Sequence, residues 1–266
     1  MRSISTLCWP TPDGRAPRGP LYCAAIIGLL LLASAPLAEM NPAKIFHSLG
    51  GMWDFATKLL AVPDWSYLPQ LGAKLLETFE MAFLATLLAT CISLPLAFFA
   101  ARNSTPRPWV GTCARTVLSF TRALPDLVWA LVFVAALGLG PLAGILALAV
   151  VTVGFMAKFF AEAIEVVDAK AVEGLTAHNA SWLQVRSFAH LPQALPDLLG
   201  SLLYILDHNF RAATILGIVG AGGIGYDLVM SMRLYDFPRL LLIMLAILLV
   251  VSSLDRLSDV LRRKIT

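Results

Sequence analysis

Charged residues are scarce in this chain of 266 residues, where Asp, Glu, Lys and Arg together make up only 14%. Hydrophobic residues make up 58% of the chain, against roughly 45–50% in soluble domains. The formal net charge of +3 is too small to indicate a nucleic-acid partner. The composition therefore predicts an all-α polytopic membrane protein, with room for about six transmembrane helices.

Motifs for metal, phosphate and catalysis are missing as well. The four cysteines, Cys8, Cys23, Cys91 and Cys113, have neither a zinc spacing nor the pattern of a disulfide framework. The four histidines show no metal spacing either. No Gly-x-x-x-x-Gly-Lys-Ser/Thr phosphate loop occurs, so any ATP that drives this protein must be hydrolysed by another polypeptide. We expect no catalytic residue, no metal site and no cofactor bound by this chain; a membrane-embedded enzyme is the alternative from a different class.

One glycine motif resembles a nucleotide site but lies in the wrong context. Gly220, Gly222 and Gly225 match the Gly-x-Gly-x-x-Gly fingerprint of dinucleotide-binding proteins. That fingerprint requires a preceding strand within a βαβ unit, whereas this one follows an apolar helix. We interpret the glycines, with Gly223, as backbone at the outer mouth of a membrane pore, where irregular structure is tolerated beside protein or water.

Six apolar runs are predicted to cross the membrane, and the third belongs to a helix that begins near Trp109. The predicted spans are residues 21–38, 75–101, 123–139, 142–165, 195–219 and 237–254. Residues 1–20 are predicted to form a cytosolic tail. The first run also resembles a secretory signal that ends at Ala33-Ser34-Ala35; we favour a retained helix.

The segments outside the spans differ in character. Residues 39–71 are amphipathic and contain Trp53 and Trp65, which is typical of a periplasmic interfacial segment. Residues 72–257 form the predicted core, and residues 258–266 a C-terminal cytosolic tail. With both termini in the cytosol, twelve Lys or Arg residues lie in the inner segments and five in the outer ones. This asymmetry is the positive-inside bias.

The polar segment between the fourth and fifth spans has the pattern of two short helices at an angle. The first covers residues 171–178, and Asn179 follows where the chain must turn, because Asn tolerates the left-handed conformation. Ser181 and Gln184 have the spacing of a capping box for the second helix. Pro192 is expected to end the segment and to push Leu191 toward an extended conformation.

This segment, residues 167–193, resembles the coupling loop of binding-protein-dependent ABC importer permeases. The family pattern is Glu-Ala-Ala, three residues, Gly, nine residues, Ile, one residue and Leu-Pro, and its spacing is kept, although Gly174, Leu175, Asn179 and Ala189 depart from it. The resemblance implies a cytosolic loop that docks into a groove of the ATPase subunit. The implied coupling residues are Glu173, Gly174, Leu175, Asn179, Ala180, Ser181, Leu191 and Pro192. The alternative is an ordinary helical hairpin with this spacing by chance.

Four further stretches resemble the phosphonate-transporter permease branch of that family. They are residues 122–134, 138–141, 154–165 and 210–225, and the likeness extends over about Lys74 to Lys264. Asp126 stands where Glu is common in the branch. Phosphite and phosphate importers share these motifs, so the resemblance implies a small phosphorus oxyanion without choosing among them.

The resemblance also implies an assembly and a place in the cell. It implies a type I importer permease in the bacterial inner membrane, surrounded by lipid and paired as a homodimer. The expected partners are two cytosolic ABC ATPase subunits, which hydrolyse the ATP, and a periplasmic solute-binding protein. The alternatives are an importer for another small solute, such as methionine, and a secondary transporter, for which no inverted pair of broken helices stands out.

Charged side chains inside the predicted spans are candidates for the substrate path. Lys158 and Glu162 are four residues apart, as are Asp207 and Arg211, so each pair can meet on one helix face. Charges in a bilayer usually face a cavity or a partner. Either the pairs hold helices together, or Arg211, Lys158 and Arg122 provide a weak electrostatic path for anions.

Overall fold

A computed structural model of the protein describes residues 18–34, 42–60 and 62–265, and the residues that it describes include no strand. The prediction of an all-α fold is therefore confirmed for this part of the chain. The chain divides into two compact units, residues 1–58 and 59–266. Each unit is described by itself.

The first unit contains two helices, α1 (Arg18–Ser34) and α2 (Pro42–Leu59), the second of which ends just past the boundary. Helix α1 covers most of the predicted first span; residues 35–38 of that span and residues 1–17 of the predicted tail lie outside the described residues. In α2, large apolar side chains are open, with Phe46 73% and Trp53 71% exposed. That exposure suits a helix at a membrane interface, and the placement there stays a prediction.

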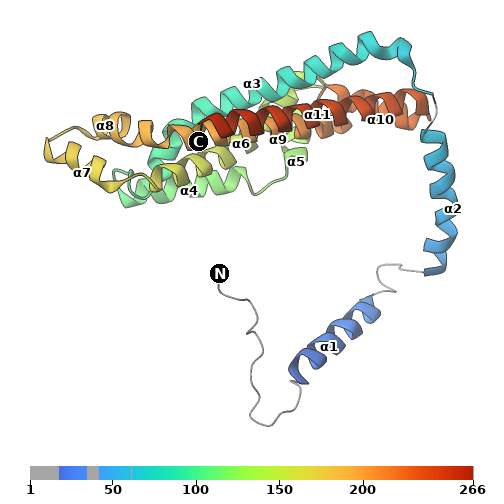
Figure 1. Ribbon diagram of the computed structural model, residues 1–266, viewed down its shortest axis with the longest axis horizontal. Helices are drawn as coiled ribbons and strands as arrows, with labels where there is room; N and C mark the ends of the chain where they lie inside the picture. The colour runs from blue at the N-terminus through green and yellow to red at the C-terminus, as the bar shows by residue number, and fades with distance from the viewer. Residues whose placement is uncertain (1–17, 35–41, 61, 266) are drawn as a thin grey trace. The chain divides into compact units, whose positions relative to one another are not determined.

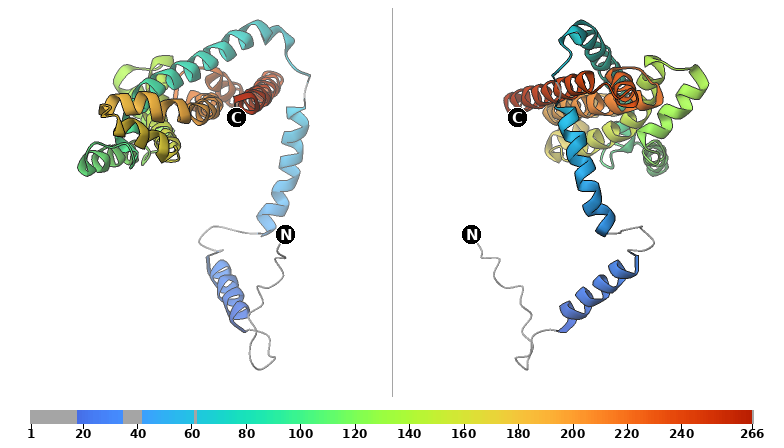
Figure 2. Two further views of the ribbon diagram at one scale, coloured as in Figure 1. Left: turned by 60° about the vertical axis from the view of Figure 1, so that its left-hand side comes forward. Right: turned by 90° about the vertical axis from the view of Figure 1, so that its right-hand side faces the viewer.

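The second unit is a bundle in which long helices run side by side (Figure 1). Its longer helices are α3 (Leu68–Ala100), α4 (Pro108–Thr121), α5 (Asp126–Leu137), α6 (Pro141–Glu165), α9 (Leu191–Leu216) and α11 (Phe237–Ile265). A short 3₁₀ turn, η1 (Trp65–Tyr67), precedes α3. Helix α10 (Ile224–Arg233) packs against α11 at one end of the bundle (Figure 2).

Helix α6 is the centre of the bundle. Of the four candidate spans it is the most covered, with 61% of its apolar window buried by other helices. The face of α3 that packs on it is made of small side chains, including Ala85, Ala89 and Ala97, all fully buried. Lipid tails supply no hydrophobic drive between helices, so small residues that let backbones approach closely are the usual means of packing in a membrane.

Four helical segments are long and apolar enough to cross a membrane: Trp65–Ala100, Pro141–Glu165, Trp182–Val219 and Phe237–Lys264. The prediction of one helix from Trp109 through residues 123–139 is wrong. The structure has α4 and α5 instead, with an 80° bend at the break between them. Pro125 has extended dihedrals at the start of α5, and a proline disfavours the helical conformation of the residue before it, so the break falls here. Within the residues that the structure describes, the count is therefore four spans, or five if the bent pair is one span, and a total of six stays a prediction.

The segment between α6 and α9 consists of α7 (Ala169–Ala177), α8 (Trp182–Val185) and a π-helical turn, η2 (Arg186–His190). Asn179 has a φ of 59°, and the capping box of Ser181 and Gln184 forms with both of its hydrogen bonds. The expected break at Pro192 is wrong, because Leu191 has helical dihedrals and Pro192 lies in the first turn of α9. A proline is tolerated there because its fixed φ of about −65° is already helical. The chain is consequently helical without a gap from Trp182 to Val219.

Candidate coupling loop and polar sites

Six of the eight predicted coupling residues lie on α7 and on the turn that follows it, beyond the end of the bundle (Figure 1), whereas Leu191 and Pro192 begin α9. Helix α7 has no buried residue, and Glu173, Gly174 and Asn179 are exposed. No atom lies within 4 Å of the place where a side chain at Gly174 would begin. Nothing among the described residues therefore requires a glycine at this position.

The loop is nevertheless fixed to the bundle through its second half. The Trp182 indole donates a hydrogen bond to the carbonyl of Ser104 (3.0 Å), and Arg186 Nε donates to the Ser104 hydroxyl (3.0 Å). Ser104 is completely buried in the connection between α3 and α4. Trp182 also stacks on Phe99, with 5.9 Å between the ring centroids. The Arg186 guanidinium lies 4.8 Å from the centroid of the Trp182 ring and forms a cation–π contact with it.

Sequence reasoning missed this anchor. Trp182 and Arg186 are 78 and 82 residues from Ser104 along the chain, so no local spacing indicates these contacts. The one signal was an exposed-looking Trp inside a polar loop, since tryptophan is rarely kept at a water-facing position without a partner. Two large apolar side chains on the same half of the loop remain open, Leu183 at 66% and Phe188 at 72% exposure.

The predicted pair of Asp207 and Arg211 forms, and a third residue joins it. Arg211 donates to the Asp207 carboxylate and also to Asp255 of α11, the latter at 2.5 Å. Asp207 is 8% exposed, whereas the side chain of Arg211 is about half exposed at 49%. One cation thus serves two carboxylates, and the cluster has a formal excess of negative charge.

The position of this cluster can be followed along its two helices. Arg211 lies twenty residues beyond Leu191 at the loop end of α9, about 30 Å at 1.5 Å per residue. Its partner Asp255 lies eighteen residues beyond Phe237, the first residue of α11, which corresponds to about 27 Å along that helix. Arg211 is also only five residues from Leu216, where α9 ends, so the cluster lies toward the end of α9 that leads into the Gly-rich segment.

A buried polar network lies next to this cluster and was also missed. Asn209, 1% exposed, accepts a hydrogen bond from Thr152 of α6 and donates one to Thr86 of α3, each 2.9 Å long. The Thr86 hydroxyl in turn donates to the carbonyl of Ala82 (2.7 Å). The Asn209 side chain therefore links α9 to α3 and α6, and the hydroxyls of Thr152 and Thr86 both find partners within the protein.

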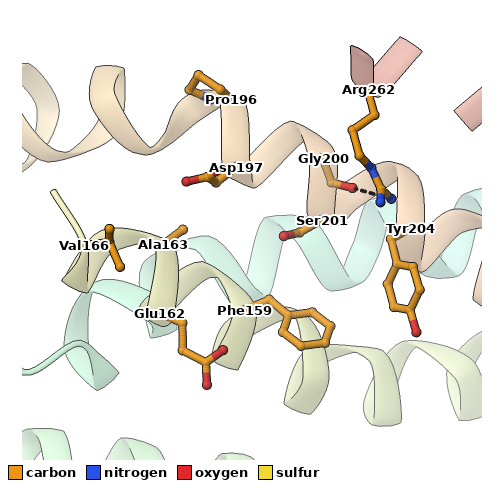
Figure 3. A pocket seen from close by; sticks show the side chains of 10 residues that line it. All are labelled: Phe159, Glu162, Ala163, Val166, Pro196, Asp197, Gly200, Ser201, Tyr204 and Arg262. Atoms are coloured by element: carbon orange, nitrogen blue, oxygen red, sulfur yellow. Dashed lines mark hydrogen bonds between the residues drawn. The ribbon is translucent and has the colours of Figure 1, made fainter. Parts of the chain in front are cut away.

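The predicted pair on α6 also forms, since Lys158 Nζ lies 3.6 Å from Glu162. Both side chains are at least half exposed, so the pair contributes little to stability. Glu162 lines a cleft of about 620 Å³ between α6, α9 and the end of α11. Figure 3 shows Arg262 reaching into this cleft from α11 to hydrogen-bond the carbonyl of Gly200 (3.4 Å), with Tyr204 and Phe159 packed edge to face beside it.

The glycines predicted at the pore mouth pack closely against neighbouring segments of the bundle, Gly223 and Gly225 being buried and Gly220 and Gly222 half-buried. A side chain at Gly225 would overlap the carbonyl oxygen of Thr214, and one at Gly220 would overlap Leu139. The amide of Gly223 donates to Glu77 (3.0 Å), and the next amide donates to Thr78 (2.8 Å). These contacts hold the segment against α3. A role as pore mouth stays a prediction.

The same end of the bundle carries a compensated set of charges. Arg239 lies over the ring of Tyr67 at 4.8 Å and within 3.8 Å of Asp64 and 3.5 Å of Asp236. The hydrogen bond from the Ser66 hydroxyl holds the pKa of Asp64 below its ordinary value. Tyr67 donates to Asp227 of α10 (2.7 Å), which ties the beginning of α3 to α10.

Long helices with small packed faces, a loop exposed beyond the bundle and charges inside the spans together define the membrane-spanning subunit of a transporter assembly. A methionine ABC transporter solved in inward-facing conformations has the same fold, with a TM-score of 0.68 and 21% identity over 76% of this chain and 99% of that one. Residues 93–266 match the family described as binding-protein-dependent transport system inner membrane component. The chain belongs to this family.

Two relatives show the family membership more closely. The phosphite transport system permease protein PtxC of Stutzerimonas stutzeri is 39% identical over 240 residues, covering 90% of this chain and 87% of that protein. The phosphate-import permease protein PhnE of Mycolicibacterium smegmatis is 42% identical over 194 residues, which is 73% of this chain and 36% of that longer protein. The predicted family and its phosphonate branch are thereby confirmed. Membership makes the chain a multi-pass inner-membrane transporter subunit and not an enzyme, with ATP hydrolysed by a separate subunit.

Proposed function

We propose that this chain is the permease subunit of an ATP-driven importer for a small phosphorus oxyanion. The substrate class follows from the relatives, whose names specify phosphite and phosphate transport. A methionine importer is the second candidate, because the methionine transporter shares the fold. We further propose a homodimer with two cytosolic ATPase subunits and a periplasmic binding protein that sets most of the substrate affinity.

The observation that carries this proposal is the combination of an open α7 with an anchored α8. Glu173 and Gly174 are exposed for a partner, while Trp182 and Arg186 fasten the loop to Ser104 between α3 and α4. A push on the loop by a closing ATPase is therefore passed to α3 and α4 through this anchor. It also passes to α9, because no break separates α8 from that helix.

Transport of the proposed substrate can be measured directly. The permease, its ATPase and its binding protein are reconstituted in vesicles, and ATP-dependent uptake of phosphite, phosphate, methylphosphonate and methionine is compared. We expect uptake of at least one phosphorus oxyanion and none of methionine. Uptake of methionine alone would contradict the substrate class while leaving the importer assignment intact.

The role of the loop is tested by changes that leave the bundle untouched. Glu173→Lys should abolish uptake and raise the ATP hydrolysed for each solute transported, because it reverses the charge offered to the ATPase. Asn179→Pro should act in the same way, because proline cannot adopt the φ of 59° found there. Wild-type uptake by both variants would exclude this loop as the coupling element.

We propose that both termini lie in the cytosol, as the charge asymmetry predicts. A reporter fused after Thr266 should then report the cytosol, and one inserted near Trp65 should report the periplasm. The opposite result at the C-terminus would place the loop between α6 and α9 outside the cell, where no ATPase can reach it.

For the substrate path we propose Arg122 and Lys158 as attractive groups, with Asp207 and Arg211 toward the far end of α9. Arg211 has two carboxylate neighbours, so it offers a passing anion little net attraction. Neutralising Asp207 and Arg211 together would leave Asp255 without its cation. The triple change Asp207→Asn, Arg211→Gln and Asp255→Asn removes the whole cluster, and undiminished uptake by that variant would leave the cluster a structural role only.

A further inference from the structure

A cationic cavity lies between the end of α3, α4 and α6. Its volume is about 230 Å³, which is ample for a small tetrahedral anion. We name it the α4 cavity. The charged residues of its lining are Arg102, Arg115, Arg122, Lys158, Glu162 and Glu165.

Two of the arginines are held in place by carbonyl groups. Arg115 Nη1 donates to the carbonyl of Ala100 (2.8 Å), and Arg122 Nε donates to the carbonyl of Leu118 (3.1 Å). The Arg122 guanidinium also lies over the ring of Phe155 at 5.7 Å. Each bond occupies one of the five N–H donors of a guanidinium, so both groups are oriented and retain donors for a ligand.

The carboxylates of the lining leave these arginines uncompensated. Glu165 accepts a hydrogen bond from the backbone amide of Arg102 (2.7 Å), and Glu162 lies beside Lys158. Within residues 62–265, neither Arg115 nor Arg122 forms an ion pair with a carboxylate. Four cations therefore face two carboxylates, and the lining has a formal charge excess of two.

Other cavities of the bundle are balanced or acidic. The cavity beside Tyr67 has Lys74 and Arg239 opposite Asp227 and Asp236. The cleft in Figure 3 combines Arg262 with two carboxylates, those of Glu162 and Asp197. Excess positive charge thus distinguishes the α4 cavity from both.

We infer that the α4 cavity binds a phosphoryl oxyanion, a tetrahedral phosphorus group with anionic oxygens. Guanidinium groups offer paired N–H donors that match phosphate oxygens. The cavity lies beside the 80° bend between α4 and α5, and broken helices inside membranes occur where they line a protein or water cavity. The group can come from a free oxyanion in transit or from the headgroup of an anionic phospholipid, which basic pockets between helices also bind. Only the first source rests on the proposed function.

Two probes separate the sources on the purified permease, without ATPase or binding protein. Calorimetry at constant ionic strength measures binding of inorganic phosphate and methylphosphonate in an uncharged detergent. Native mass spectrometry measures retention of phosphatidylglycerol against phosphatidylcholine after extraction from mixed vesicles. Each is repeated on the double variant Arg115→Gln, Arg122→Gln. The matched control is Arg107→Gln, an exposed arginine outside the lining.

We expect the double variant to bind the responding probe about tenfold or more weakly, since it loses charge-assisted hydrogen bonds, while the control variant binds as the wild type does. Phosphate binding that depends on the two arginines identifies the free oxyanion. If only the retention of phosphatidylglycerol depends on them, the ligand is the lipid headgroup.

Should the double variant fold poorly, Ser119→Glu brings an anion into the lining while both arginines stay, and it should weaken binding in the same way. If neither probe distinguishes the wild type from these variants, the inference is wrong. Failure of transport with intact binding would instead count against the proposed function.

Discussion

The Gly-rich segment after α9 and the coupling loop after α6 both carry small residues at motif positions, but the surroundings of those residues differ. At Gly217 and Gly225 an added Cβ would overlap backbone atoms of the facing turn. At Gly174 it would meet nothing within 4 Å. The first pair is explained by contacts inside this chain. The second position has no such explanation within this chain, and its contact with a partner stays a proposal.

The comparison predicts how the purified chain responds to the same change at each glycine. Gly225→Ala should have the largest effect, because the new methyl group would collide with the carbonyl oxygen of Thr214, which is backbone and cannot rotate away. We expect a loss of about 3 kcal/mol in the free energy of unfolding, which is at the upper end for overpacking. This loss corresponds to a fall in Tm of roughly 6–12 °C. Thermal unfolding in detergent measures it. Gly72→Ala, also on a helix but with open space around it, is the matched control. A Tm equal to that of the control would show that the segment repacks easily.

The network around Asn209 gives a smaller effect of the same kind. Asn209→Leu removes two interhelical hydrogen bonds and leaves the Thr152 hydroxyl without its acceptor. Hydrogen bonds between membrane helices average about 0.6 kcal/mol each, so we expect a loss of roughly 1–2 kcal/mol. A double-mutant cycle with Thr152→Val isolates the bond between the two residues. Strict additivity of the two changes would mean that this bond contributes nothing.

A change at Trp182 tests the second half of the coupling loop, which is fixed to Ser104 between α3 and α4. Trp182→Phe keeps an aromatic ring for stacking on Phe99 but loses the hydrogen bond to Ser104. We expect a loss of only about 1 kcal/mol in stability and a clear loss of uptake per ATP hydrolysed, because the loop then transmits movement less directly. Leu183→Ala, an exposed neighbour on the same helix, serves as the control for stability. Unchanged coupling in Trp182→Phe would mean that the continuous helix from α8 into α9 carries the movement alone.

The sequence predicted those contacts that depend on local spacing. Each of these features lies within one turn or one helix. They are the capping box of Ser181 and Gln184, the left-handed conformation of Asn179, and the pair of Lys158 and Glu162. Their geometry follows from the helical repeat and from side-chain chemistry alone. The four long spans were predictable for a similar reason, because the length and hydropathy of each are properties of a continuous segment.

The contacts that were missed depend on which helices become neighbours. Asp255 is 44 residues from Arg211, and Ser104 is 78 from Trp182. No periodicity within one segment indicates such partners. Pro192 shows a different limit: the conformational rule for the residue before proline was applied to Leu191, but a continuous helix entered through a π turn outweighed it. The bend between α4 and α5 was missed, because a proline indicates where a helix can break but not the angle of the break.

The smallest expected change in stability belongs to Gly174, and it is the sharpest test of the comparison. Gly174→Phe adds a large side chain into open space, so the Tm of the purified permease should stay within about 1–2 °C, as for surface substitutions generally. If a partner closes on this position, the same side chain holds the two surfaces apart, and both co-purification with the ATPase and uptake should fall at least about tenfold. Gly174→Ala adds only one methyl group and should retain most of both. An ATPase complex of wild-type affinity in Gly174→Phe would place the partner elsewhere. A marked fall in Tm would show instead that α7 is packed within its own chain, and the contrast with Gly225 would no longer hold.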